Sequence, residues 1–77
     1  MRVRLYAAAA EAVGQAQVEI DVAQMTAADL LDRLAGSDEQ AQLVLGCCRV
    51  FADGKSVRAG EQVCGEEVEI LPPFAGG

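Results

Sequence analysis

The sequence predicts a single α+β domain in which one main helix packs across one face of a mixed sheet of about five strands. Three observations lead to this fold class. Apolar and polar residues alternate near both ends of the chain, as they do in strands with one buried face. A stretch in the middle carries its apolar residues at helical spacing. The 77 residues are 52% hydrophobic, which is enough for one aliphatic core but not for two.

The first third of the chain predicts two strands joined by a short helical turn. Val3, Leu5 and Ala7 alternate with arginine and tyrosine, which indicates the first strand. Residues 8–12 are rich in alanine and predict one helical turn, which ends where Gly14 supplies a positive φ. Residues 17–22 alternate again, with valine and isoleucine on one face, and predict the second strand.

Two helices are predicted next, each by a capping pattern at its start. Thr26 stands three residues before Asp29 and resembles the start of a capping box. Ser37 and Gln40 repeat this spacing before a second, short helix that ends at Gly46. The main helix is amphipathic, with an apolar face made of Ala27, Leu30, Leu31 and Leu34.

A hairpin is predicted in the second half of the chain. Residues 49–52 show strand alternation and lead into Asp53 and Gly54, a strong signal for a two-residue hairpin turn. Residues 56–57 form the short returning strand.

The last regular element completes a recognisable order. Gly60 and Gly65 mark a surface loop, and residues 66–71 alternate as a final strand. The order is strand, strand, helix, short helix, strand, short strand, strand, which is the order of the ubiquitin-like β-grasp fold. That topology implies that the first and last strands pair in parallel at the centre of the sheet.

Charge and hydropathy limit the function classes. The net charge is −6, and only six lysines and arginines are present, scattered along the chain. Nucleic-acid binding needs clustered cations, so it is not expected, and a basic protein partner is favoured. The chain has no apolar run of membrane-spanning length, and we expect a cytoplasmic protein with no membrane contact.

Cysteines and carboxylates offer two further hypotheses. Cys47, Cys48 and Cys64 suit neither a disulfide framework nor a zinc site, so reduced thiols are expected. They are either small apolar fillers at strand edges, which we favour, or a vicinal redox pair or persulfide relay. The three glutamates of the last strand and its approach, Glu66, Glu67 and Glu69, are interpreted as a solvated face, and no metal site is expected.

The six residues after Leu71 carry the candidate chemistry. Two prolines end the strand and favour an extended conformation, so residues 1–71 form the domain and residues 72–77 a tail. The tail could span about 20 Å at about 3.3 Å per residue, enough to enter a neighbouring active site. Its only reactive group is the carboxylate of Gly77, which needs activation to become an electrophile. We expect the rest of the tail to bind the partner: Pro72, Pro73, Phe74, Ala75 and Gly76.

Both ends of the chain resemble the small subunit of molybdopterin synthase, a family of ubiquitin-like sulfur carriers. The run Gly65-Glu66-Glu67-Val68, followed by Pro72-Pro73-Phe74-Ala75-Gly76-Gly77, is similar to that family's C-terminal signature. The family's first strand and turn are matched by Val3, Leu5, Tyr6, Ala7, Glu11, Val13 and Gly14.

This resemblance implies a carrier cycle. An adenylyltransferase of the ubiquitin-E1 type would use ATP to adenylate Gly77, and a sulfur donor would convert the adenylate to a thiocarboxylate. The large synthase subunit would then receive the tail and transfer the sulfur to a pterin precursor. The chain would bind no cofactor and would not be an enzyme on its own.

Two other classes of function stay open. One is a carrier for another pathway, such as thiamine thiazole or cysteine formation, or a ubiquitin-like protein modifier. The other is a β-grasp interaction adaptor with an inert tail. Among the aromatic residues we expect only Phe74 to contact a partner, whereas Tyr6 is a weaker candidate and Phe51 fits the core equally well.

Overall fold

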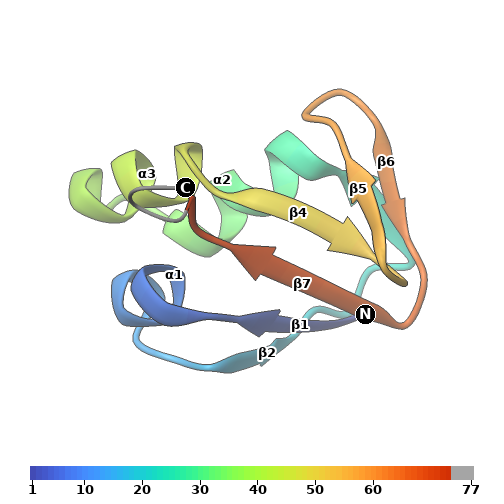
Figure 1. Ribbon diagram of the computed structural model, residues 1–77, viewed down its shortest axis with the longest axis horizontal. Helices are drawn as coiled ribbons and strands as arrows, with labels where there is room; N and C mark the ends of the chain where they lie inside the picture. The colour runs from blue at the N-terminus through green and yellow to red at the C-terminus, as the bar shows by residue number, and fades with distance from the viewer. Residues whose placement is uncertain (74–77) are drawn as a thin grey trace.

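The computed structural model describes residues 1–73, and Phe74, Ala75, Gly76 and Gly77 lie outside the described residues. Seven strands and three helices are found in the described part of the chain (Figure 1). In chain order they are β1 (Arg2–Leu5), α1 (Ala7–Val13), β2 (Gln17–Glu19), β3 (Gln24–Thr26), α2 (Ala27–Ala35), α3 (Glu39–Gly46), β4 (Arg49–Ala52), β5 (Lys55–Val57), β6 (Gln62–Cys64) and β7 (Glu67–Leu71).

Five strands form a mixed sheet in the order β2-β1-β7-β4-β5. The first and last strands are the central neighbours and run in parallel, with Val3 opposite Val68. All other pairs in this sheet are antiparallel. The predicted β-grasp fold, with its parallel central pair, is therefore confirmed.

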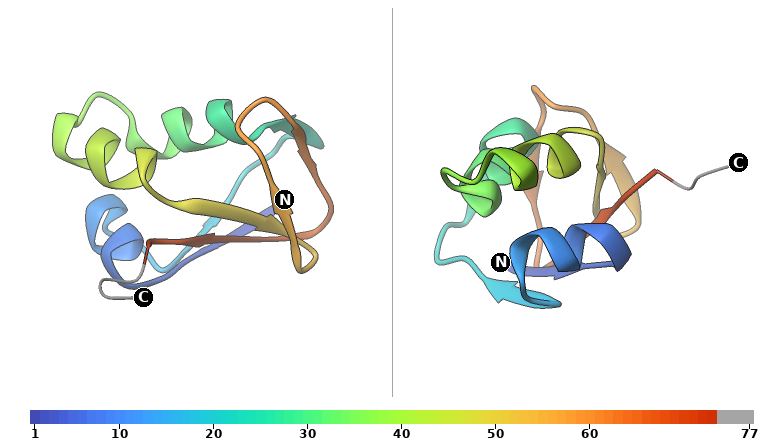
Figure 2. Two further views of the ribbon diagram at one scale, coloured as in Figure 1. Left: turned by 45° about the horizontal axis from the view of Figure 1, so that its top comes forward. Right: turned by 90° about the vertical axis from the view of Figure 1, so that its left-hand side faces the viewer.

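The helices pack against one face of this sheet and enclose an aliphatic core. Both α2 and α3 lie over that face, and α1 packs beside α3 at the end of the sheet where β1 and β7 finish (Figure 2). The core contains no buried polar side chain among residues 1–73. Its largest fully buried side chains are those of Leu30, Leu45, Ile70, Val3, Val63 and Val68.

Two local predictions from the sequence are confirmed. The hydroxyl oxygen of Thr26 accepts a hydrogen bond of 3.1 Å from the backbone N–H of Asp29 and caps α2. Asp53 and Gly54 both have positive φ, 49° and 82°, as a type I′ turn between β4 and β5 requires.

The helix count differs from the prediction. Residues 8–12 were expected to form a single turn, but α1 extends over Ala7–Val13 because Ala9 is fully buried and anchors the helix to the core. Gly14 ends it as expected, with φ of 84° and its N–H bonded to the carbonyl of Ala10 at 2.8 Å.

The prediction of a second strand over residues 17–22 was wrong in length. The strand β2 ends at Glu19, because Ile20 already pairs with Met1 and β1 offers no partner for the residues that follow.

A small second sheet was missed. Strands β3 and β6 pair with Met25 opposite Val63, inside a region that the sequence indicated as a surface loop. Each strand has three residues with one core-facing apolar side chain, which is too short for a periodic signal.

The cap of α3 was assigned to the wrong residue. Asp38, and not Ser37, precedes the helix, and its Oδ1 accepts hydrogen bonds from Gln40 N at 2.9 Å and Ala41 N at 3.3 Å. The two residues are adjacent and both are common N-caps, so composition did not separate them. Gly46 is the last residue of the helix and does not follow it.

Candidate functional site

The candidate site is the base of the tail, where the chain leaves the end of β7. This strand lies between β1 and β4, and its last residue, Leu71, pairs with Arg49. The backbone N–H of Tyr6 donates a 3.2 Å hydrogen bond to the carbonyl of Ile70, so β7 is held on both sides close to its end. The tail therefore starts from the middle of the sheet.

The structure describes only the first two residues of the predicted tail. Pro72 is half-buried and Pro73 is exposed, and neither has an N–H with which to extend the ladder. The other predicted site residues, Phe74, Ala75, Gly76 and Gly77, lie outside the described residues, so their roles stay predictions.

The face of the sheet away from the helices surrounds this base. Tyr6 follows β1 and is 36% exposed, and Phe51 lies directly opposite Glu69 in the β4–β7 register. Strand alternation places Leu71 on the same face as Glu69. Apolar surface from Tyr6, Phe51 and Leu71 thus gathers around the start of the tail, on the side that no helix covers in the described residues (Figure 2).

Glu69 is a charged residue that lies next to this apolar surface, on the same face of the sheet. Its carboxylate accepts a hydrogen bond of 2.7 Å from the Tyr6 hydroxyl. This bond, assisted by partial desolvation, raises the pKa of Tyr6 above its ordinary value. The phenol is therefore held neutral and fixed in direction beside the base of the tail.

Sequence reasoning identified part of this face. Alternation correctly indicated the outward direction of the side chains in β1 and β7. It expected partner contacts from residues 72–76 and, among the aromatic residues, favoured only Phe74. It did not anticipate that Leu71 shares one region with Tyr6 and Phe51. The signal was incomplete because a period of two assigns a residue to a face without naming its neighbour on the next strand.

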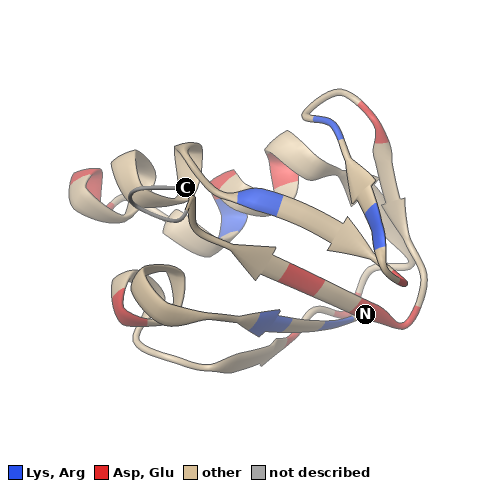
Figure 3. Ribbon diagram, viewed as in Figure 1, with Lys and Arg blue, Asp and Glu red and all other residues tan. Residues whose placement is uncertain are grey.

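Charged residues are spread along this face of the sheet (Figure 3). Arg49 lies opposite Leu71 at the tail end, and Arg4 lies opposite Glu69. Arg2 lies between two carboxylates, with Nε 3.1 Å from Glu19 Oε1 and Nη1 3.4 Å from Glu67 Oε1. All three side chains are about half exposed or more, so each ion pair contributes little to stability. The glutamates of β7 thus make cross-strand contacts on an open face, which agrees with their interpretation as a solvated strand face.

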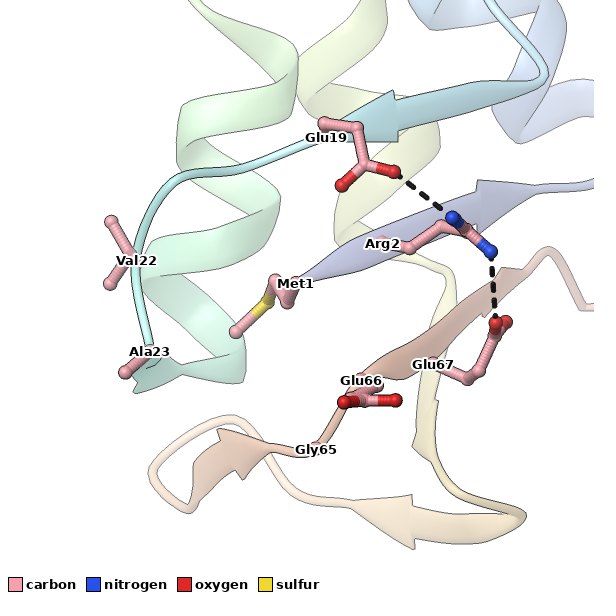
Figure 4. A pocket seen from close by; sticks show the side chains of 8 residues that line it. All are labelled: Met1, Arg2, Glu19, Val22, Ala23, Gly65, Glu66 and Glu67. Carbon is pink, nitrogen blue, oxygen red and sulfur yellow. Dashed lines mark hydrogen bonds and ion pairs between the residues drawn. The ribbon is translucent and has the colours of Figure 1, made fainter.

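A hollow of about 390 Å³ opens beside these charges (Figure 4). It lies where β7 begins, next to Met1 and Glu66, whereas the tail leaves from the opposite end of β7. The hollow is therefore not positioned to act on the tail. Its lining consists of Met1, Arg2, Glu19, Val22, Ala23, Gly65, Glu66 and Glu67.

The three cysteines are free and differ in environment. Cys47 and Cys64 are exposed and fill no apolar space, so the interpretation of the cysteines as small apolar fillers at strand edges was wrong for these two. Cys48 is half-buried, its thiol donates to the carbonyl of Val44 at 3.2 Å, and burial raises the pKa of that thiol. Cys47 and Cys48 precede Arg49, which pairs with Leu71, so they lie at the tail end of the sheet.

Within residues 1–73, no three cysteine or acidic side chains are grouped in a way that would suit a metal ion. No helix in the same range has both the length and the hydrophobicity needed to cross a bilayer.

Comparison with known proteins agrees with the fold. The family model described as "ThiS family" matches residues 3–77. The crystal structure of SAMP1 from Haloferax volcanii superposes with a TM-score of 0.72 at 31% identity, covering 99% of this chain and 97% of that one. A structure of small archaeal modifier protein 1 from the same organism gives a TM-score of 0.70 at 30% identity, with 95% of each chain covered. No curated protein matches at a significant level. With the family model covering nearly the whole chain, and with a β-grasp sheet whose central strand leads into the tail, this protein belongs to the ThiS family of ubiquitin-like carriers and modifiers.

Proposed function

We propose that this chain is a sulfur carrier whose working group is the carboxylate of Gly77. The observation that carries the proposal is the family match, which continues through Gly76 and Gly77 to residue 77. Glycines have no Cβ, so they pass through a narrow channel and allow close approach by a nucleotide. The role of the carboxylate is to be adenylated with ATP by an activating enzyme of the ubiquitin-E1 type, with release of pyrophosphate. A sulfur donor then displaces AMP and leaves a thiocarboxylate.

The base of the tail supports this role. Hydrogen bonds from both neighbouring strands fix β7, and the two prolines direct the chain out of the sheet. The apolar surface of Tyr6, Phe51 and Leu71 adjoins this exit. An enzyme that receives the tail therefore meets a flat docking face and a reach of about 20 Å beyond it.

The pathway we propose is molybdopterin synthesis, with this chain as the small subunit of molybdopterin synthase. The support is the run Gly65-Glu66-Glu67-Val68 together with Pro72-Pro73 and the terminal glycines. The catalytic residues would lie on the large subunit, which passes the sulfur to a pterin precursor. The free thiols support work in a reducing compartment such as the cytoplasm.

A protein modifier is the second candidate, because the two crystal structures named above are of SAMP1 and of small archaeal modifier protein 1. In that function the same adenylate would be attacked by a lysine amine, giving an isopeptide bond. Carriers for thiamine thiazole or cysteine formation would use the same thiocarboxylate with a different acceptor.

The test is to incubate the protein with an E1-like enzyme, ATP and a sulfur source, and to record intact and C-terminal peptide masses. We expect one oxygen of Gly77 to be replaced by sulfur. Deleting Gly77 should leave the unfolding midpoint unchanged and abolish the exchange, because the shortened tail ends about 3.3 Å before the reaction centre. Sulfur found on a cysteine and never on Gly77 would refute the proposal.

The acceptor is identified in a second step. The thiocarboxylate form is given the large synthase subunit and the pterin precursor, or a cell extract with ATP. Sulfur transfer to the pterin supports the synthase role. The modifier is supported by lysine peptides that carry residues 59–77 of this chain as a branch after trypsin digestion, because Arg58 is the last basic residue before the C-terminus.

A further inference from the structure

A second surface of the molecule lies at the edge of the sheet, two strands away from the strand that leads into the tail. It is the outer edge of β2 together with a hollow of about 360 Å³ between β2 and α2. We propose that this edge binds an extended segment of a basic partner protein, which adds a strand next to β2 with apolar residues facing the hollow and lysines or arginines facing outward.

The backbone of β2 offers free hydrogen-bonding groups. The backbone N–H of Ile20 donates a hydrogen bond to the carbonyl of Met1, and the amino group of Met1 donates one to the carbonyl of Ile20. The carbonyl of Ala16 accepts a hydrogen bond from the N–H of Leu5. Alternate residues of this segment therefore direct their backbone groups toward β1. The pattern of antiparallel pairing therefore turns the N–H and C=O groups of Gln17 and Glu19 away from β1. Neither residue has a backbone partner on that side within residues 1–73. An incoming strand would satisfy these groups, as in other cases of strand addition to a sheet edge.

The opposite edge of the sheet, at β5, is less open to an added strand than the edge at β2. Along β5 only Ser56 turns its backbone outward without a partner, because the hairpin register pairs Lys55 and Val57 with β4. At the next outward position, Arg58 N–H donates to the Glu61 carboxylate at 2.8 Å and Arg58 C=O accepts from Glu61 N at 2.9 Å. A tight turn thus blocks this edge, and β2 is the better acceptor of a strand.

The hollow beside β2 has both apolar and polar side chains in its lining. Val13, Val18 and Leu34 are half-buried around it, and Ile20 is buried beneath them. Side chains of an added strand alternate between the two faces, so every second residue would enter this hollow. Gln15, Glu19 and Arg33 also line it, and all three are exposed, so the less exposed part of the hollow is apolar.

The outward positions select basic side chains. Glu19 lies on the outer face and forms an ion pair with Arg2, which also pairs with Glu67. With Arg4 opposite Gln17 and Glu69 opposite Arg4, this part of the face holds two cations and three carboxylates, a net charge of −1. Asp21 is exposed immediately after this segment, and the whole chain has a net charge of −6. Opposite charges on neighbouring strands attract, and the overall charge steers a basic segment toward the protein.

The experiment uses the full chain and the acetylated, amidated peptide Lys-Val-Lys-Val-Lys-Val-Lys, with a twin that has glutamate in place of each lysine. Amide chemical shifts are followed by NMR during titration to about 1 mM peptide. We expect saturable shifts at Gln17, Glu19 and Leu34 with the lysine peptide and much weaker ones with the glutamate twin.

Two variants form a matched pair at the two edges. Gln17→Pro removes an outward N–H from β2, and Ser56→Pro removes one from β5, and neither N–H serves the ladder within the sheet. Gln17→Pro should weaken binding by about threefold to tenfold and Ser56→Pro should not change it. Glu19→Lys should reverse the preference between the two peptides. Spectral dispersion of each variant verifies that it is folded.

Three results would overturn the proposal. The first is equal loss of binding in both proline variants, and the second is no saturable shift at Gln17 or Glu19 with the lysine peptide. The third is a dimer of the free protein that Gln17→Pro dissociates, since the edge would then be an interface between two copies of this chain. Deleting Gly77 should leave peptide binding unchanged, so this test is independent of the sulfur-carrier proposal.

Discussion

The hydroxyl of Tyr6 donates a 2.7 Å hydrogen bond to Glu69 across 63 positions of sequence. It links the residue after β1 to the outer face of β7, next to the point where the tail begins. Because Tyr6 is the only tyrosine, its ionisation can be observed directly.

Replacing Glu69 by glutamine should lower the pKa of Tyr6. In the native protein this pKa is raised, first by the hydrogen bond to Glu69, so folding favours the neutral phenol. The resulting stabilisation is complete below the unfolded pKa of about 10 and is lost as pH rises through the higher folded value. Phenolate absorbance across this range measures the midpoint. Glu67→Gln, which removes a contact to Arg2, is the control and should not move it.

Two leucines on helices should respond very differently to truncation. Leu30 belongs to α2, and its side chain is 0% exposed in the core. Leu30→Ala should therefore lower the free energy of unfolding by about 2 to 5 kcal/mol. Leu43, on α3, is 69% exposed, and Leu43→Ala should change stability by less than about 0.5 kcal/mol. Urea unfolding of both variants measures the difference, and equal effects would contradict the assigned core.

The start of α3 gives a test of the corrected cap. Asp38→Ala removes the acceptor for two backbone N–H groups and should destabilise the protein by about 1 kcal/mol. Ser37→Ala lies one residue earlier, makes no described side-chain bond, and should be nearly neutral. A thermal or urea series on the two variants decides between them; a larger loss from Ser37→Ala would restore the assignment made from sequence.

Replacing Cys47 and Cys64 by serine and Cys48 by alanine should leave sulfur transfer intact. Two of these thiols are exposed and contribute little packing, and only Cys48 is partly buried, so a modest loss of stability is expected. Thiocarboxylate formation at Gly77 is measured as for the native chain. A folded triple variant that no longer accepts sulfur would contradict this prediction and favour the persulfide relay. Cys47 and Cys48 lie at the tail end of the sheet, which is the reason for this test.

Long or strongly patterned segments were predictable from sequence because local forces specify them. The hairpin at Asp53 and Gly54 needs positive φ at both residues, and the cap at Thr26 depends on a spacing of three. The pair β3 and β6 was not predictable, because Val63 is buried by contacts distant in sequence and not by a pattern around it.

Part of the candidate site was predictable from the sequence, and part was not. The tail was identified from Pro72, Pro73 and the terminal glycines, since proline ends a strand in any context. The face around its base was not identified, because Phe51 and Leu71 come from β4 and β7 and Tyr6 from the residue after β1.

By itself, the sequence determined the alternation of β1 and β7, the amphipathic α2, the hairpin turn and the family signature of the tail. Each of these depends on backbone conformation and on the spacing of a few neighbouring residues. Only the tertiary structure decided that β7 lies between β1 and β4, that Glu69 bonds Tyr6, and that β2 has an open edge while Arg58 and Glu61 close the edge at β5. The reason is physical: a period of two fixes the face of a residue, whereas its neighbours depend on how the whole sheet pairs to bury its core.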